Sequence, residues 1–175
     1  EKFGLKTHFR IIPRDFGKLS DGTISAEIEE IVTSSNSMTF DEYVQGRIYH
    51  LLISILWNNI IYSPFFKFMQ KKNISLINFF TYFKNNYKQQ GPKSFVNFVD
   101  SFIKDTKGEL WDSQESLLEH VKKEENYQKL LEGKLGHNLL QTYHAKSMHL
   151  FSEWNDYFYD IFKEQVKYDS LNSEE

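Results

Sequence analysis

The residues best suited to chemistry in this chain are its six histidines, because a neutral imidazole can bind a metal ion or transfer a proton near neutral pH. Two histidines lie one helical turn before a second potential ligand: His144 precedes Met148, and His149 precedes Glu153. The two pairs fall on different faces of a helix, and neither belongs to an HExxH motif, the usual signature of a helical zinc site. We therefore predict no metal site and expect these histidines to lie on the surface or in the packing.

Other catalytic motifs are missing from the sequence. The chain has no cysteine, which excludes disulfides, a thiol nucleophile and any iron-sulfur or zinc site that needs thiolate ligands. It also lacks a glycine-rich phosphate loop, a serine elbow and a catalytic pair of carboxylates. We therefore predict that this chain alone has no catalytic residues and no cofactor of its own.

Two polar clusters are candidates for contacts with a ligand. Arg10 and Arg14 lie on either side of Pro13 and could bind an anion, although a local ion pair with Asp15 is the commoner outcome at the end of a strand. The second cluster contains Tyr43, Arg47 and His50, which recur at helical spacing along one stripe. This trio could hold a ligand or tie down the preceding loop, and the loop-tying role is the default.

The helix that carries the second cluster has the best-specified start in the chain. Thr39 and Glu42 have the spacing of a capping box, and Met38 can pack on Tyr43 across the first turn. Apolar residues then follow at helical spacing at Val44, Ile48, Leu51, Leu52, Ile55 and Leu56. The pattern predicts a helix over residues 36–57, on which the other helices pack.

The first cluster belongs to a predicted β-ribbon. Alternating residues indicate strands over residues 6–12 and 24–33, and Pro13 is expected to end the first one. Further helices are predicted over 63–69, 75–90 and 93–107, then from a capping box at Asp112, continuing or restarting as far as 131, and over 137–167. The sequence thus predicts a mainly α fold, α+β at most, with about six helices in an irregular, aromatic-rich bundle and a short N-terminal β-ribbon.

Composition supports one folded domain. The chain has 175 residues, of which 17% are aromatic, including 16 Phe and 10 Tyr, so we expect a core of packed rings. We predict a single domain with a ribbon and loop over residues 1–35, a helical body over 36–168 and a frayed tail over 169–175. The start at Glu1, without an initiator Met or a signal peptide, indicates a piece of a larger protein. The longest apolar stretch is too short for a membrane span, so we predict a cytoplasmic protein that does not enter a membrane.

Charge is unevenly distributed along the chain. Residues 43–99 contain seven Lys and Arg and no Asp or Glu, whereas residues 100–175 contain 16 acids and nine bases. Neutralisation inside the fold, with lysines of the middle helices near acids such as Asp156, Asp160 and Glu164, is the preferred explanation. The alternative is that the basic, aromatic segment 43–99 binds nucleic acid or an acidic partner.

Three blocks of sequence resemble the C-terminal region of cobalamin-binding radical S-adenosylmethionine proteins. The first reads Thr-His-Phe-Arg-Ile-Ile-Pro-Arg-Asp-Phe-Gly over residues 7–17. The second reads Asn-Ser-Met-Thr-Phe-Asp-Glu-Tyr over 36–43 and Gly-Arg-Ile-Tyr-His over 46–50, and the third reads Leu-Gly-His-Asn-Leu-Leu over 135–140. The first two blocks are the more specific, and residues 63–134 resemble the family only as a helical insert.

In that family, a cobalamin-binding domain and a barrel with a CxxxCxxC-bound iron-sulfur cluster precede such a segment. The resemblance implies a non-catalytic accessory domain that packs on the catalytic barrel and helps shape the substrate cavity. The iron-sulfur cluster, S-adenosylmethionine and cobalamin would then be cofactors of the parent protein, and its cobalamin-binding and radical domains would be the partners of this chain. The alternative is a free-standing helical interaction module that uses segment 43–99.

Six residues are the predicted contacts with substrate or with the parent domains. They come from the first two blocks. The arginines near Pro13 are predicted anion or backbone contacts, and the asparagine is predicted to close the loop before the capped helix. The polar stripe is predicted to lie on the exposed edge of that helix. The six residues are Arg10, Arg14, Asn36, Tyr43, Arg47 and His50.

Overall fold

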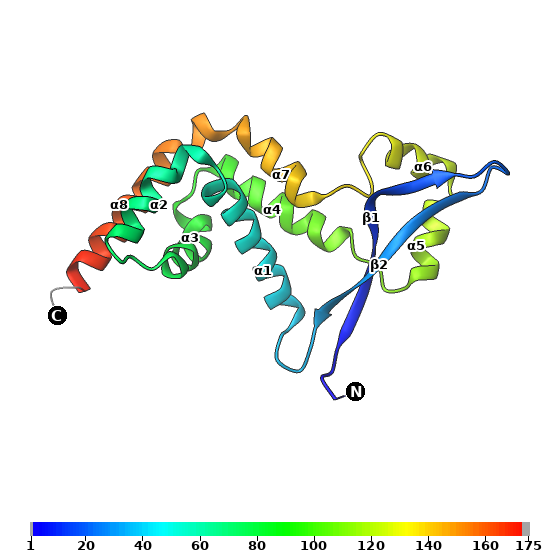
Figure 1. Cartoon of the computed structure of the whole chain (residues 1–175), viewed down its shortest axis with the longest axis horizontal. Coiled ribbons are helices and arrows are strands. Elements are labelled where there is room, and N and C mark those ends of the chain that lie inside the picture. Colours follow the sequence, from blue (N-terminus) through cyan, green and yellow to red (C-terminus); the bar gives the residue numbers. More distant parts are fainter. Residues whose placement is uncertain (1, 173–175) are drawn as a thin grey trace. The chain divides into compact units, whose positions relative to one another are not determined.

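The protein is mainly α-helical, with one two-stranded antiparallel sheet, as predicted. A computed structural model describes residues 2–172, with side chains as far as Lys167. The described residues form eight α-helices, a π-helical turn and a 3₁₀ turn (Figure 1). Of the predicted frayed tail, residues 173–175 lie outside the described residues, and the last helix continues to Asn172.

The chain divides into two compact units. Unit 1 comprises Glu1–Gln45 and Ile103–Thr142, and unit 2 comprises Gly46–Phe102 and Tyr143–Glu175. All three points at which the chain passes from one unit to the other fall within helices, namely α1 (Phe40–Leu52), α4 (Lys93–Gly108) and α7 (Leu139–Met148). The two units are described separately below.

Unit 1 is built around the β-ribbon. Strand β1 (Lys6–Lys18) pairs with β2 (Ile24–Ser34), and both strands are longer than predicted. The prediction that Pro13 ends the first strand is wrong. Four residues of β1 lie between the pairs Ile11↔Ile28 and Phe16↔Ala26, where β2 has a single residue. This bulge takes Pro13, which has no N–H group, out of the hydrogen-bonded ladder and lets the strand continue.

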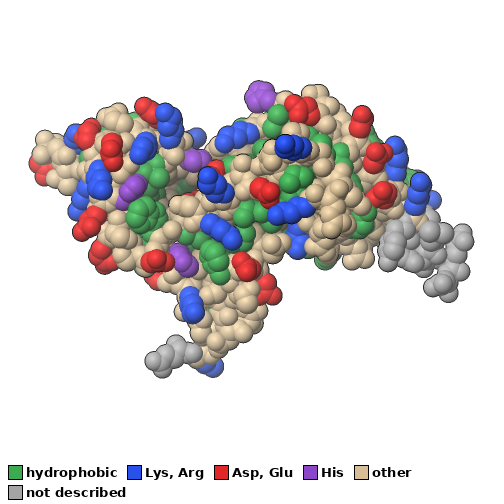
Figure 2. Space-filling model, turned by 180° about the vertical axis from the view of Figure 1, so that it is seen from behind, with side chains coloured by type: hydrophobic (Ala, Val, Ile, Leu, Met, Phe, Trp, Pro, Cys, Tyr) green, Lys and Arg blue, Asp and Glu red, His purple; other side chains and the backbone are tan. Residues whose placement is uncertain are grey.

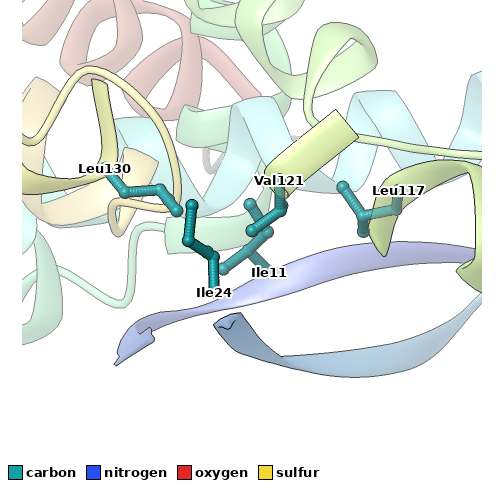
Figure 3. Packing of buried hydrophobic residues seen from close by; sticks show 5 residues of the cluster. All are labelled: Ile11, Ile24, Leu117, Val121 and Leu130. Atoms are coloured by element: carbon teal, nitrogen blue, oxygen red, sulfur yellow. The ribbon is translucent and has the colours of Figure 1, made fainter. Parts of the chain in front are cut away.

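One face of the ribbon packs against two short helices, α5 (Gln114–Val121) and α6 (Glu124–Leu131). Figure 3 shows side chains from both strands meeting side chains from these helices in one cluster: Ile11, Ile24, Leu117, Val121 and Leu130. Helix α5 begins one residue later than predicted, because Ser113 and not Asp112 caps it. The Ser113 Oγ atom accepts a hydrogen bond from the backbone N–H of Ser116 at 3.1 Å.

Helix α1 has the predicted capping box. The Thr39 Oγ1 atom accepts from the N–H of Glu42 at 3.2 Å, and Glu42 Oε2 accepts from the N–H of Thr39 at 2.7 Å. The α-helix is shorter than the predicted span of 36–57. It begins at Phe40 and ends at Leu52, and a π-helical turn, Ile53–Trp57, follows.

Unit 2 has a core of packed aromatic rings. Figure 1 shows α2 (Ser63–Lys71) and α3 (Leu76–Gln90) beside α8 (Phe151–Asn172). The rings of Phe79 and Phe162 stack with their centroids 4.7 Å apart, and Trp154 is fully buried. The single helix predicted over 137–167 is wrong, because α7 ends at Met148 and α8 begins at Phe151.

The break between α7 and α8 has a local cause. The Ser147 hydroxyl donates to the carbonyl oxygen of His144 at 2.6 Å, and the N–H of Leu150 donates to the carbonyl oxygen of Ser147 at 2.9 Å. The backbone bond from Leu150 spans three residues, so the turn is tighter than an α-helix and redirects the chain, and the Ser147 side chain bonds back to the preceding turn.

Opposite charges are partly neutralised within the described units. In unit 2, Lys88 Nζ lies 3.3 Å from Asp100 Oδ1, and Lys163 Nζ lies 3.1 Å from Asp160 Oδ1 on the same helix. Figure 2 shows one face of the molecule, on which Lys and Arg side chains lie among Asp, Glu and hydrophobic side chains.

Two glycines after α6 allow a matched test of the packing in unit 1. Gly133 has φ +67° with open space around it, whereas Gly136 has φ +58° and a Cβ atom there would lie 2.7 Å from Leu130 Cδ2 and 3.0 Å from Ile11 Cγ2. We expect Gly133→Ala to lower the free energy of unfolding by about 1–2 kcal/mol through backbone strain alone. Gly136→Ala should lower it by roughly 1–3 kcal/mol more, because it also crowds the core. Equal losses in urea denaturation would contradict this packing.

Alkaline pH should destabilise unit 2 through its buried tyrosines. The Tyr62 hydroxyl donates to Asn155 Oδ1 at 2.6 Å, and burial, together with the nearby Tyr159, raises the pKa of Tyr62 to about 12. The unfolded chain releases this proton near pH 10, so stability present below pH 10 is lost as the pH rises toward 12. Between pH 9 and 11 we expect Tyr62 to account for a loss of about 1 kcal/mol. In urea denaturation, Tyr62→Phe should show a correspondingly smaller fall over this range, and an unchanged fall would refute the assignment.

Candidate functional site

The three sequence blocks that carry the family resemblance meet largely in unit 1. Residues 7–17, 36–43 and 135–140 all belong to this unit, while residues 46–50 belong to unit 2. The His8 ring of the first block lies 5.6 Å from the Phe40 ring of the second. Gly136 of the third block lies so close to Ile11 of the first that a side chain would crowd it. Segments far apart in the sequence are therefore brought together here.

The first and third blocks line a pocket of about 250 Å³. Strand β1 supplies one wall, the end of α4 and the segment after it supply a second, and the turn between α6 and α7 supplies a third. The lining residues are Arg10, Ile11, Asp105, Gly108, Glu109, Trp111, Leu117, Lys134, Leu135, Gly136, His137 and Leu139.

Backbone hydrogen bonds fix the second wall against the ribbon. The N–H of Phe9 donates to the carbonyl oxygen of Trp111 at 2.8 Å, and the N–H of Trp111 donates back to Phe9 at 2.9 Å. This short antiparallel bridge lies on the edge of β1 opposite β2. The Trp111 ring lies 4.8 Å from the ring of His120 on α5. Two contacts therefore hold Trp111 at the pocket wall, one through its backbone and one through its side chain.

Arg10 is the best-connected charged residue of the pocket. Its Nε atom lies 2.6 Å from Glu29 Oε1, and one terminal nitrogen lies 3.1 Å from Glu109 Oε1. Burial alone would lower the pKa of Arg10, but the carboxylates of Glu109 and Glu29 outweigh it and raise the pKa. These two acids, and not Asp15, are its ion-pair partners. Because two carboxylates already balance its charge, Arg10 is better suited to hold the pocket wall than to bind an anion.

The other predicted contacts in unit 1 lie outside the pocket. Arg14 is exposed in the bulge of β1, with φ 72°. Asn36 joins the loop before α1 to the N-terminal segment, since its N–H donates to the carbonyl oxygen of Phe3 at 2.9 Å. The Tyr43 ring stacks on Phe40 with the centroids 6.1 Å apart. Asn36 therefore has the geometry of a loop-closing residue.

The last two predicted contacts, Arg47 and His50, belong to unit 2. The Arg47 guanidinium lies over the Phe102 ring, 5.7 Å from its centroid, and His50 is exposed on α1. Of the six predicted residues, Arg10 lines the pocket and the other five do not. Sequence reasoning missed Glu109, Trp111 and Lys134, which lie in irregular segments and carry no periodic signal. His137 lies within the third block of the family resemblance, and its place in that block was the signal that could have identified it as a site residue.

A serine and a histidine meet in unit 2. The Ser54 Oγ atom lies 2.9 Å from His144 Nδ1, within the range of a nucleophile and its base. Ser54 is only 8% exposed, however, and no hydrogen bond from His144 to a carboxylate is found among the described residues. The pair therefore serves to tie the π-helical turn to α7. Among the side chains that the structure describes, residues 2–167, no three His, Asp or Glu gather as they would around a metal ion.

Replacement of Arg10 tests its role at the pocket. In Arg10→Met, the carboxylates of Glu29 and Glu109 lose their shared partner while remaining only 35% and 18% exposed. We expect the free energy of unfolding to fall by about 2 kcal/mol in urea denaturation. Arg14→Met, at an exposed position of the same strand, should change it by less than about 0.5 kcal/mol. Similar losses in the two variants would mean that the ion pairs at Arg10 contribute no more to the free energy of unfolding than an exposed charge does.

Comparisons of the chain with protein-family models, with curated proteins and with solved structures found no match. Within the described part of the chain, none of the helices has the length and apolar character required to cross a bilayer. The proposed function therefore rests on the resemblance of the three sequence blocks and on the geometry of the chain itself.

Proposed function

We propose that this chain is a non-catalytic accessory domain of a cobalamin-dependent radical S-adenosylmethionine enzyme. It packs on the catalytic barrel of the parent protein and helps shape the substrate cavity. The iron-sulfur cluster, S-adenosylmethionine and cobalamin belong to the other domains of the parent, because a chain without cysteine offers no thiolate for the cluster.

One observation carries the proposal: all of the first and third blocks and residues 36–43 of the second belong to unit 1, and the first and third blocks line one pocket. The contacts between the blocks involve particular side chains. Ile11 packs where Gly136 leaves room, and His8 lies against Phe40. Residues that share a pocket wall are suited to a common role at a surface or a ligand, and the polar side chains in the lining suit a small polar substrate.

For the alternative function, an interaction module that uses segment 43–99, binding of nucleic acid is the less well supported case. Nucleic acid binding without a sequence preference needs exposed rings on which bases stack. Most rings of this segment are buried in the core of unit 2, including Phe66, Phe79, Phe83 and Phe95. Among its described residues, Trp57 and Phe68 are the exposed large rings. The segment is therefore poorly built for base stacking.

The gene provides the first test of the proposal. Reading the open reading frame upstream of Glu1 should reveal an in-frame CxxxCxxC motif preceded by a cobalamin-binding domain. A stop codon immediately upstream would refute the accessory-domain function.

The pocket provides the second test, carried out in the full-length parent enzyme. Lys134 lines the pocket and its side chain is 70% exposed, so Lys134→Met should leave the melting temperature unchanged. We expect this variant to raise KM about tenfold, or to lower kcat by a similar factor, which corresponds to ~1.4 kcal/mol. Lys122→Met, at an exposed position outside the pocket, is the control and should retain full turnover. Full activity of both variants would show that the pocket is not part of the substrate cavity.

A further inference from the structure

Unit 2 contains an apolar groove that its own core does not fill. The groove has a volume of about 320 Å³ and lies between α1 with its π-helical extension and α3. Its lining has no charged side chain and consists of Tyr49, Ile53, Trp57, Leu76, Ile77 and Phe80.

The lining residues form two rows on neighbouring helices. Tyr49, Ile53 and Trp57 follow at intervals of four residues along α1 and the π-helical turn. They extend over roughly 12 Å, or about two helical turns. The opposite row comes from the first turns of α3. The Tyr49 hydroxyl lies 3.0 Å from Thr81 Oγ1, and this hydrogen bond joins the two helices at the groove.

Large apolar side chains remain accessible at the groove. Ile77 is 78% exposed and Trp57 is 39% exposed, although both belong to ordered helical segments. The Trp57 ring packs edge-on against Phe66, 5.0 Å away, so its orientation is fixed. Trp57 also lines a smaller hollow together with Lys67. An exposed apolar surface of this kind is typical of an interaction site.

The rim of the groove is basic. All of its lining residues come from segment 43–99, which contains no Asp or Glu. Lys84 Nζ lies 5.2 Å from the centre of the Tyr49 ring on one side. Lys67 lines the adjoining hollow that shares Trp57 with the groove. A partner that buried its apolar side chains here would therefore meet lysines near Tyr49 and near Trp57.

We propose that this groove binds an amphipathic, acidic α-helix of a protein partner. The two rows match the helix-in-groove mode of recognition, in which side chains at positions i, i+3 or i+4, and i+7 of the incoming helix insert between two receptor helices. Acidic residues flanking that apolar face pair with the lysines at the rim. The groove lies in unit 2, so this inference does not rest on the accessory-domain function or on the pocket of unit 1.

Other anionic partners fit the groove less well. A membrane surface requires apolar side chains that project from a convex face, whereas most of these residues line a hollow. RNA requires several exposed rings for stacking, and Trp57 is the exposed ring of this lining. An amphipathic helix uses both the apolar rows and the lysines.

The test uses the full chain and a fluorescein-labelled helical peptide of about 14 residues, roughly four turns, with leucine along one face and glutamate on its flanks. Fluorescence anisotropy should show saturable binding that weakens as salt is added. The same peptide with lysine in place of glutamate should bind much more weakly. Vesicles containing phosphatidylserine, and polyuridine RNA, are the competing probes, and neither should displace the acidic peptide.

Two isoleucines provide matched variants. Ile77→Asp places a negative charge in the groove and should weaken peptide binding roughly tenfold, as expected for a central interface residue. Ile60 is 86% exposed and lies outside the groove, so Ile60→Asp should bind as the unchanged chain does. Circular dichroism establishes that both variants fold. Equal effects of the two substitutions, absence of peptide binding, or preferential binding of vesicles or RNA would each overturn the proposal.

Discussion

The constraint that shapes unit 1 is that a two-stranded ribbon is not stable by itself in water. Such a hairpin is marginal until its apolar face packs on other elements. Here α5 and α6 provide that cover through Leu117, Val121 and Leu130. The backbone bridge between Phe9 and Trp111 adds a short third pairing along the edge of β1. The segment from Ile103 to Thr142 must therefore return to the N-terminal residues, and the pocket forms where it does so.

Local signals in the sequence were sufficient for the starts of several helices. The capping box of Thr39 and Glu42 acts within a few residues and is present as predicted. The starts of α2, with its proline, and of α3, with its N-cap at Ser75, are equally local and lie at or next to the predicted positions. The overall class, mainly α with one ribbon, follows from the same periodic patterns. These features need no knowledge of the rest of the chain.

The missed features depend on partners that lie far away in the sequence. Arg10 suggested an ion pair with nearby Asp15, but its second carboxylate is Glu109, 99 positions away. The strand passes Pro13 because a bulge removes that residue from pairing, and periodicity cannot register an irregular insertion. The pocket has the same origin, since its walls come from three separate stretches. The turn between α7 and α8 is a local exception, since its hydrogen bonds around Ser147 span three residues and helical periodicity did not register them.

The interleaved connectivity of the two units has a consequence for how the chain is made and folded. Neither unit is a continuous segment, so the ribbon is synthesised before its covering helices, which come only with the segment from Ile103 onward. The residues of unit 2 intervene as a loop whose closure has an entropic penalty that grows only slowly with length. That segment completes its aromatic core only with Trp154 and Phe162 of α8, which lie later in the sequence. Each unit therefore becomes complete only when a later segment has been made: Ile103–Thr142 for the ribbon, and α8 for the aromatic core.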